Sequence, residues 1–156
     1  MAGEFGHVSL DPDGPVCSCG RRGCWEVFGS QRAALRYYKE MKAGAQDVEF
    51  QELLMLAEEG DKAALKAFET MAHAVGRGMR MIVAGLEPEQ IVVVGECTKL
   101  WSLMGPVIEA EVASAVLAGK PPLIRPASDP RMARLRGTVA LVLQKHFGAS
   151  SLFASR

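Results

Sequence analysis

The sequence lacks an excess of charge of either sign. Its 156 residues include 18 Lys and Arg against 18 Asp and Glu, which predicts neither a basic nucleic-acid surface nor an acidic tail. It also lacks any apolar run near the ~20 residues that a membrane-spanning helix needs. We therefore expect no membrane attachment, and DNA contact only through a domain outside this segment.

We also expect neither a secretory leader nor low-complexity linkers. Residues 1–7 are mostly small or polar and contain no apolar segment of the kind found in signal peptides. Apolar residues make up 49% of the chain, as expected for an ordinary globular domain with a core. We expect a cytoplasmic, reducing setting, in which clustered cysteines bind metal more often than they form disulfides.

Most of the chain is predicted to be helical, apart from residues 1–29. That first segment is rich in Gly, Pro and Cys and is expected to be irregular, with a short strand at 7–10. Capping residues predict a helix after Ser30, a second ended by Gly60, a third after Asp61, and a last one with Pro130 in its first turn. The expected helices cover 31–42 (ended by Gly44), 50–58, 62–85, 99–117 and 130–147.

The long helix has the clearest periodicity. Apolar residues alternate spacings of three and four, which predicts a core-facing stripe; they are Leu65, Phe68, Ala72, Val75, Met79, Ile82 and Leu86. Gly76 and Gly78 interrupt the helix at about 1 kcal/mol each relative to Ala. We expect close packing against a neighbouring backbone to compensate.

The second half alternates helix and strand. The β-branched run Ile91–Val94 ends at Gly95 and predicts a buried strand, and Leu123–Arg125 predicts another. Helix and strand in alternation indicate a helix-rich α/β layering. Because two strands do not complete a sheet, we expect the parent fold to contain further strands.

Four residues near the amino end have the composition of a structural zinc site. They are His7, Cys17, Cys19 and Cys24, and one imidazole with three thiolates forms a closed tetrahedral Zn²⁺ shell. Such a shell leaves no position for a catalytic water. Gly20 and Gly23 would let the chain turn tightly enough for the cysteines to reach one ion, and Arg21 and Arg22 would offset the excess negative charge.

Two other interpretations of these cysteines remain open, namely free buried thiols and disulfides. Three of the four cysteines in the chain lie within eight residues, which chance burial does not explain. Cys17 and Cys19 are separated by one residue, an awkward geometry for a disulfide. Cys97 stands apart and is expected to be a small buried residue.

The segment Gly3-Glu4-Phe5-Gly6-His7, followed by Pro12-Asp13-Gly14 and by Cys17-x-Cys19-Gly20-x-x-Gly23-Cys24-x-Glu26, closely resembles the signature of the ROK family. That family comprises sugar-responsive repressors, open reading frames and sugar kinases. The resemblance covers residues 1–156 as the carboxy-terminal lobe of a family member, divided into a zinc-binding segment (1–29) and a helical and α/β remainder (30–156). It implies part of an actin-like, ribonuclease H-like ATPase fold with a zinc-organised loop and, we expect, a homo-oligomer.

The resemblance also implies which residues bind sugar. Glu4, His7 and Glu26 match the family positions that contact sugar hydroxyls. Carboxylate oxygens accept protons from vicinal hydroxyls, and a metal-bound histidine has a second ring nitrogen for an outward hydrogen bond. Judged without the resemblance, Glu4 and Glu26 are ordinary solvated charges.

The resemblance allows two classes of activity for the parent protein, sugar kinase and transcriptional repressor. Family kinases carry their phosphate loop and catalytic aspartate in the amino-terminal half, so this chain is expected not to phosphorylate sugar alone. Gly95 matches the position where a nucleotide approaches the backbone, but Glu96 adds bulk and negative charge there. Trp25 and the run from Leu135 to Leu143 also favour the transcriptional-repressor branch, whose winged-helix domain is expected to lie outside this chain. A sugar kinase of the glucokinase or N-acetylhexosamine kinase type is the alternative.

Overall fold

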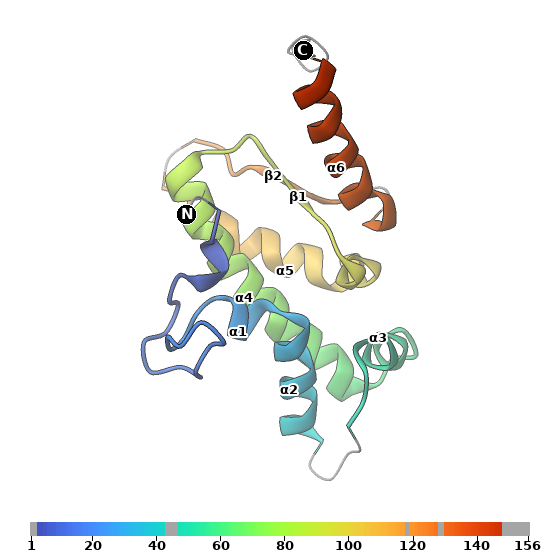
Figure 1. Cartoon of the computed structure of the whole chain (residues 1–156). Helices are drawn as coiled ribbons and strands as arrows, with labels where there is room; N and C mark the ends of the chain where they lie inside the picture. Colours follow the sequence, from blue (N-terminus) through green and yellow to red (C-terminus); the bar gives the residue numbers. More distant parts are fainter. Residues whose placement is uncertain (1–2, 43–46, 118, 128–129, 148–156) are drawn as a thin grey trace.

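A long central helix organises the chain. The computed structural model describes residues 3–42, 47–117, 119–127 and 130–147. Helix α4 (Lys62–Leu86) packs against α2 (Gln31–Met41), α3 (Phe50–Glu58) and α5 (Trp101–Ala113) (Figure 1). Of the helices in these ranges, none is both long enough and apolar enough to cross a membrane.

The predicted caps of two helices are confirmed. The Ser30 hydroxyl accepts a hydrogen bond from the Ala33 N–H at the start of α2, and the Asp61 carboxylate accepts one from the Ala64 N–H at the start of α4. Both side chains satisfy amides that lack partners within the helix. Helix α2 ends at Met41, and the predicted stop at Gly44 lies outside the described residues.

The core lies around α4, against which α2, α3 and α5 pack. Its largest fully buried side chains include Phe68, Leu53, Leu54, Met71, Ile108 and Val112. The predicted stripe on α4 is confirmed at Phe68, Ala72 and Met79, which are buried. It is wrong at Leu86, which is exposed at the end of the helix.

The two glycines of α4 lie where other elements approach closely, but the nearest atoms belong to side chains rather than to the neighbouring backbone that we predicted. A Cβ at Gly76 would lie 2.5 Å from the Cβ of Glu111 on α5. A Cβ at Gly78 would lie 1.9 Å from Cε2 of Trp25. Both distances are far below van der Waals contact, so only glycine permits this packing.

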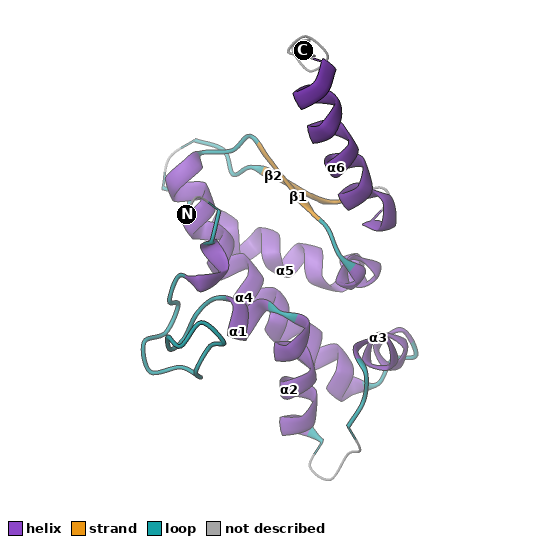
Figure 2. Cartoon of the chain, in the orientation of Figure 1, coloured by secondary structure: helices purple, strands orange, loops and turns teal. Residues whose placement is uncertain are grey.

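The sheet consists of two parallel strands, β1 (Gln90–Val93) and β2 (Leu123–Pro126), with Ile91 paired to Ile124. Figure 2 shows both strands passing between α5 and the last helix, α6 (Pro130–Phe147). The prediction of a buried first strand is wrong, because Val92 of β1 is exposed and Ile91 and Val93 are only partly covered. In β2, Leu123 is exposed and Ile124 is buried.

The helix after β1 is shorter than predicted. Residues Glu96–Leu100 form a 3-10 helix (η2), and α5 then ends at Ala113 rather than at Leu117. Leu117 is 99% exposed, so no packing supports further helical turns there. Helix α6 begins at Pro130 as predicted, while Asp129 lies outside the described residues.

Residues 3–29 form a mostly irregular loop, as predicted. The expected strand at 7–10 is wrong: Phe5–His7 is a 3-10 helix (η1), and only Ser9 makes an isolated antiparallel bridge, to Cys24. A short helix, α1 (Glu26–Gly29), was not predicted. Both η1 and α1 pack against α4, which therefore supports the loop.

Candidate metal centre

The irregular loop brings the four predicted metal ligands together. One ligand atom from each of His7, Cys17, Cys19 and Cys24 lies within 4.8 Å of every other. Cys17 Sγ is 3.6 Å from His7 Nδ1, and Cys19 Sγ is 3.6 Å from Cys24 Sγ. Tetrahedral Zn²⁺ with sulfur ligands at about 2.3 Å places neighbouring sulfurs about 3.8 Å apart. The cluster therefore has the donor atoms and spacing to hold a metal ion.

The backbone turns that build the cluster depend on Gly23. It adopts φ +64°, and a Cβ there would lie 1.4 Å from the carbonyl oxygen of Asp11. The Gly23 carbonyl accepts hydrogen bonds from the N–H groups of Leu10 and Asp11, and its own N–H donates to Pro15. Gly20 also has a positive φ, +85°, but open space around it. Of the two predicted turn glycines, Gly23 is therefore the sterically essential one.

The thiols of the cluster have opposite pKa shifts. Hydrogen bonding from the Cys19 backbone lowers the pKa of Cys17 to about 7, helped by the side chains of Cys19, His7 and Ser18. Burial raises the pKa of Cys24 to about 11, and the neighbouring thiols of Cys19 and Cys17 add to the rise. A metal binds thiolates and displaces these protons. A cation at the cluster would thus stabilise the thiolate of Cys24, which burial disfavours.

The two alternative interpretations of the clustered cysteines were disulfides and free buried thiols, and neither accounts for the whole group. All four cysteines are free, and the Cys19–Cys24 sulfur separation of 3.6 Å is well beyond the ~2.05 Å of a disulfide. Cys17 and Cys24 are buried but Cys19 is exposed, so burial does not explain the group. Cys97 is only half-buried, and burial raises its pKa.

Of the three predicted sugar-contacting residues, Glu4 and Glu26 lie beside the cluster and His7 belongs to it. His7 Nε2 is 3.8 Å from Glu4 Oε2, and His7 Nδ1 is 3.5 Å from Glu26 Oε2. Glu26 Oε2 is also 4.0 Å from Cys17 Sγ. Both carboxylates are exposed. The fold therefore presents two acceptor groups and an imidazole together at the surface of the cluster.

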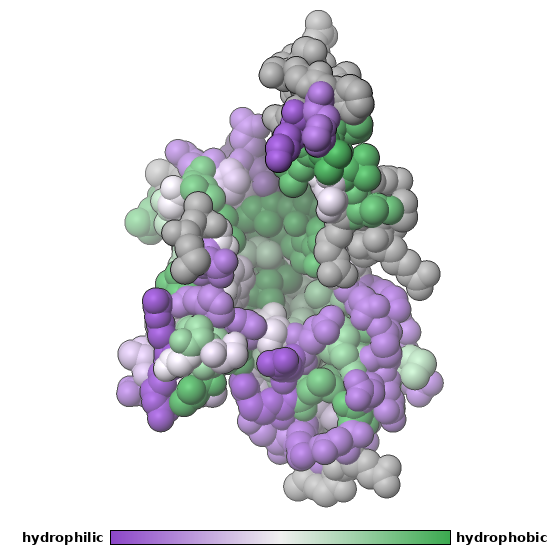
Figure 3. Space-filling view, viewed as in Figure 1, coloured by the Kyte–Doolittle hydropathy of each residue, from purple (hydrophilic) through white to green (hydrophobic). Residues whose placement is uncertain are grey.

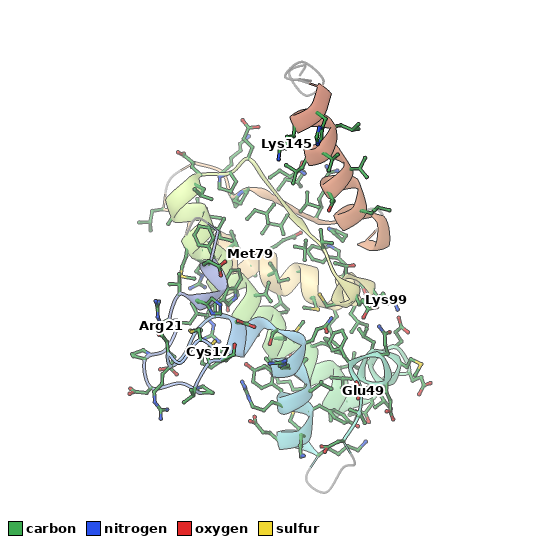
Figure 4. All side chains as sticks on the ribbon, in the orientation of Figure 1. Cys17, Arg21, Glu49, Met79, Lys99 and Lys145 are labelled. Atoms are coloured by element: carbon green, nitrogen blue, oxygen red, sulfur yellow. The ribbon has the colours of Figure 1, made fainter. Side chains whose placement is uncertain are left out.

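The predicted nucleotide position lies elsewhere. Gly95 has φ +137°, a conformation that side-chain-bearing residues avoid, and it precedes η2. Glu96 accepts a hydrogen bond from Gln51 of α3, a contact that the sequence did not reveal. Figure 4 shows Cys17 and Lys99 of η2 on opposite sides of α4. The described residues thus do not bring Gly95 into the metal cluster.

The arginines and the cavities do not add to the cluster. Arg22 Nη1 donates to the Gly14 carbonyl at 3.4 Å, so this arginine also braces the loop. A cavity of about 610 Å³ lies between α5 and β2, away from His7. Its walls are Pro106, Glu109, Ala110, Ala113, Pro121, Pro122, Leu123 and Ile124.

Similar proteins include both regulators and kinases. The chain is 30% identical over 149 residues to a xylose repressor of Bacillus spizizenii, in a match that covers 94% of this chain and 38% of the repressor. It is 27% identical over 157 residues to a glucokinase of Streptomyces coelicolor, in a match that covers 91% of this chain and 49% of the kinase. The chain thus spans less than half the length of these curated relatives.

Solved structures share the fold. A ROK family glucokinase from Streptomyces griseus, crystallised with glucose and AMPPNP, superposes with a TM-score of 0.77 at 27% identity, covering 90% of this chain and 51% of that one. Such structures have the actin-like ATPase fold, so this helix-rich α/β chain forms part of that fold. The ROK family model matches residues 1–145. The chain belongs to the ROK family.

Proposed function

We propose that this chain is the sugar-binding, zinc-containing part of a ROK-family sugar-responsive transcriptional regulator. In this proposal His7, Cys17, Cys19 and Cys24 hold a structural Zn²⁺, and Glu4, His7 and Glu26 contact sugar hydroxyls. The observation that carries it is the double placement of His7. One ring nitrogen faces the Cys17 thiol at 3.6 Å, and the other faces the Glu4 carboxylate at 3.8 Å.

The chemistry of the loop supports both roles. When bound, Zn²⁺ would organise the loop, because four protein ligands fill its shell. Holding Nδ1 at the metal keeps the proton of His7 on Nε2, so the ring donates outward. Glu4 and Glu26 would accept from vicinal sugar hydroxyls on either side of it. Thiolate ligands of this kind require a reducing compartment, for which we propose the cytoplasm.

The corner after β1 favours a regulator over a kinase. Glu96 begins η2 directly after Gly95 and is hydrogen-bonded to Gln51, which holds a carboxylate where a nucleotide would bring phosphates. Three of the described aspartates have structural roles: Asp11 Oδ1 accepts from the Asp13 N–H, Asp47 pairs with Lys39, and Asp61 caps α4. Within the described ranges no aspartate is placed as a general base beside His7.

The alternative is part of an ATP-dependent sugar kinase, favoured by the similarity to the two Streptomyces glucokinases. In the regulator, sugar would shift an equilibrium between two arrangements of the lobes and so alter DNA affinity. We propose that DNA is contacted through a domain outside this chain, and that the protein is a homo-oligomer.

Calorimetric titration of the full-length protein tests the proposal. Xylose, glucose and an ATP analogue are each titrated into the protein. We expect one sugar to bind, Glu26→Gln to weaken that binding at least about 10-fold because a charged acceptor is lost, and the ATP analogue to give no heat.

The control is Glu52→Gln, an exposed glutamate on α3, which should bind sugar like the unaltered protein. Nucleotide binding would support the kinase instead. Sugar binding that is unchanged in Glu26→Gln would contradict the assigned contact.

A further inference from the structure

Trp25 lies between the metal loop and the central helix. It follows the metal-cluster residue Cys24 in sequence and precedes Glu26. Its backbone N–H donates to the Val8 carbonyl at 2.8 Å, next to the bridge between Ser9 and Cys24. Its side chain packs against the hydrophobic core. The residue thus connects both sides of the loop to the interior.

The indole ring of Trp25 occupies a slot formed by two glycines. A Cβ at Gly78 of α4 would lie 1.9 Å from Cε2 and 2.2 Å from Nε1 of the ring. A Cβ at Gly29 of α1 would lie 3.0 Å from Nε1. The ring therefore contacts bare backbone on both helices, and the slot admits no larger residue at Gly78.

The indole N–H is buried and has no hydrogen-bond partner among the described residues. Burying an unpaired donor opposes folding, so hydrogen bonding does not explain why an indole lies here. Its shape does, because the flat fused ring fills a slot that two missing Cβ atoms create. The position of the ring is fixed by contact with the glycines.

We propose that Trp25 is a positioning residue, which, seated between Gly29 and Gly78, fixes Cys24 and Glu26 relative to His7. This inference rests on the proposed zinc and sugar site. A shift of the ring moves the Cys24 sulfur and the Glu26 carboxylate together, since both residues adjoin it. The metal affinity of the loop is thereby coupled to the packing of α4.

Substitutions of three glycines on α4 test the inference, and two of them serve as controls for the third. Gly78→Ala displaces the indole. Gly76→Ala strains the contact with Glu111 on the α5 side, and Gly85→Ala meets no atom within 4 Å. Zinc affinity is measured on the full chain by competition with a chromophoric chelator, alongside thermal melting.

We expect Gly78→Ala to bind zinc about 10–100-fold more weakly, the range seen when groups supporting metal ligands are lost. Gly76→Ala should melt at lower temperature yet keep its zinc affinity, and Gly85→Ala should resemble the unaltered protein. Equal losses of zinc affinity in Gly78→Ala and Gly76→Ala, or no loss in Gly78→Ala, would overturn this inference but not the zinc assignment. Absence of zinc from the unaltered protein would overturn the zinc assignment as well.

A rescue variant and a fluorescence signal provide independent readouts. The methyl group introduced by Gly78→Ala would clash with the fused ring of Trp25, and Trp25→Phe removes that ring. In the Trp25→Phe protein, adding Gly78→Ala should therefore cause little further loss of zinc affinity. In a Trp101→Phe background Trp25 is the remaining tryptophan, and chelation should shift its emission. Trp25→Leu replaces Gly78→Ala as the test if Gly78→Ala does not fold. We expect Trp25→Leu to weaken zinc binding at least about 10-fold. Unchanged zinc binding in Trp25→Leu would refute the positioning role.

Discussion

Cys19 is the exposed thiol of the metal cluster, whereas Cys17 and Cys24 are buried. Its sulfur nevertheless lies 3.6 Å from that of Cys24. An exposed cysteine contributes little to packing, so replacing Cys19 tests its metal-binding role without disturbing the core. The same does not hold for Cys24, whose removal would leave a gap in the interior.

We predict that Cys19→Ser releases the metal. A hydroxyl is a poor replacement for a thiolate, so zinc affinity should fall by more than the roughly 10–100-fold typical of lost supporting groups. Elemental analysis and chelator competition measure this. Cys97→Ser, outside the cluster, should retain one equivalent of zinc. A full equivalent in Cys19→Ser would show that the ligand set is wrong.

At the scale of elements, helix α4 is the platform on which the rest is assembled. It contacts η1, α1, α2, α3 and α5, and Met79 is labelled on it near the centre of Figure 4. Its first turn is held by Asp61 and its middle by a polar contact with α5.

We predict that Asp61 makes the stability of α4 depend on pH. Hydrogen bonding from the Ala64 N–H, with help from Lys42, lowers the pKa of Asp61. The group therefore stabilises the fold above the ordinary Asp pKa, and this contribution is lost as the pH falls through the lowered value. Thermal melts from pH 7 to 3 should show a smaller decline in Asp61→Asn, which keeps the cap without the charge. Parallel curves for the two proteins would contradict the prediction.

We predict that Glu111→Ala is destabilising by about 2 kcal/mol. Glu111 on α5 pairs with Arg80 and lies 2.8 Å from His73 Nδ1, both on α4. Its side chain is only 18% exposed, so its removal leaves Arg80 partly buried without a carboxylate. Glu69→Ala breaks the exposed pair with Lys66 and should cost less than about 0.5 kcal/mol. Urea unfolding measures both, and equal losses would argue against the α4–α5 link.

At the scale of the whole molecule, apolar surface is concentrated around the strands and the last helix. Figure 3 shows it in a hollow below α6. The exposed apolar residues in or next to β1, β2 and α6 include Val92, Val94, Leu123, Leu135, Val139 and Val142. Surface of this kind favours association.

We predict that this chain self-associates at tens of micromolar. Sedimentation velocity should show species larger than the 16.8 kDa monomer, and Val139→Glu combined with Val142→Glu should shift the population toward monomer. A single monomeric species for the unaltered chain at these concentrations would exclude the prediction.

Local chemistry in the sequence determined where α2, α4 and α6 begin and the composition of the cluster, but it predicted neither the short helix α1 nor the early end of α5. Ser30 and Asp61 cap helices because their side chains reach amides three residues on, and Pro130 begins α6 because its ring suits a first turn. The spacing of His7, Cys17, Cys19 and Cys24 indicated one site since few other roles gather such donors. The family signature placed Glu4 and Glu26 beside them.

Only the tertiary structure decided which contacts join distant segments. The slot for Trp25 needs Gly29 and Gly78 from two helices, and the bond of Gln51 to Glu96 joins residues 45 positions apart. Periodicity reports which face of an element is apolar, but whether that face is covered depends on its neighbours. For that reason Ile91–Val94 had the pattern of a buried strand, while β1 has a single partner strand and leaves Val92 exposed.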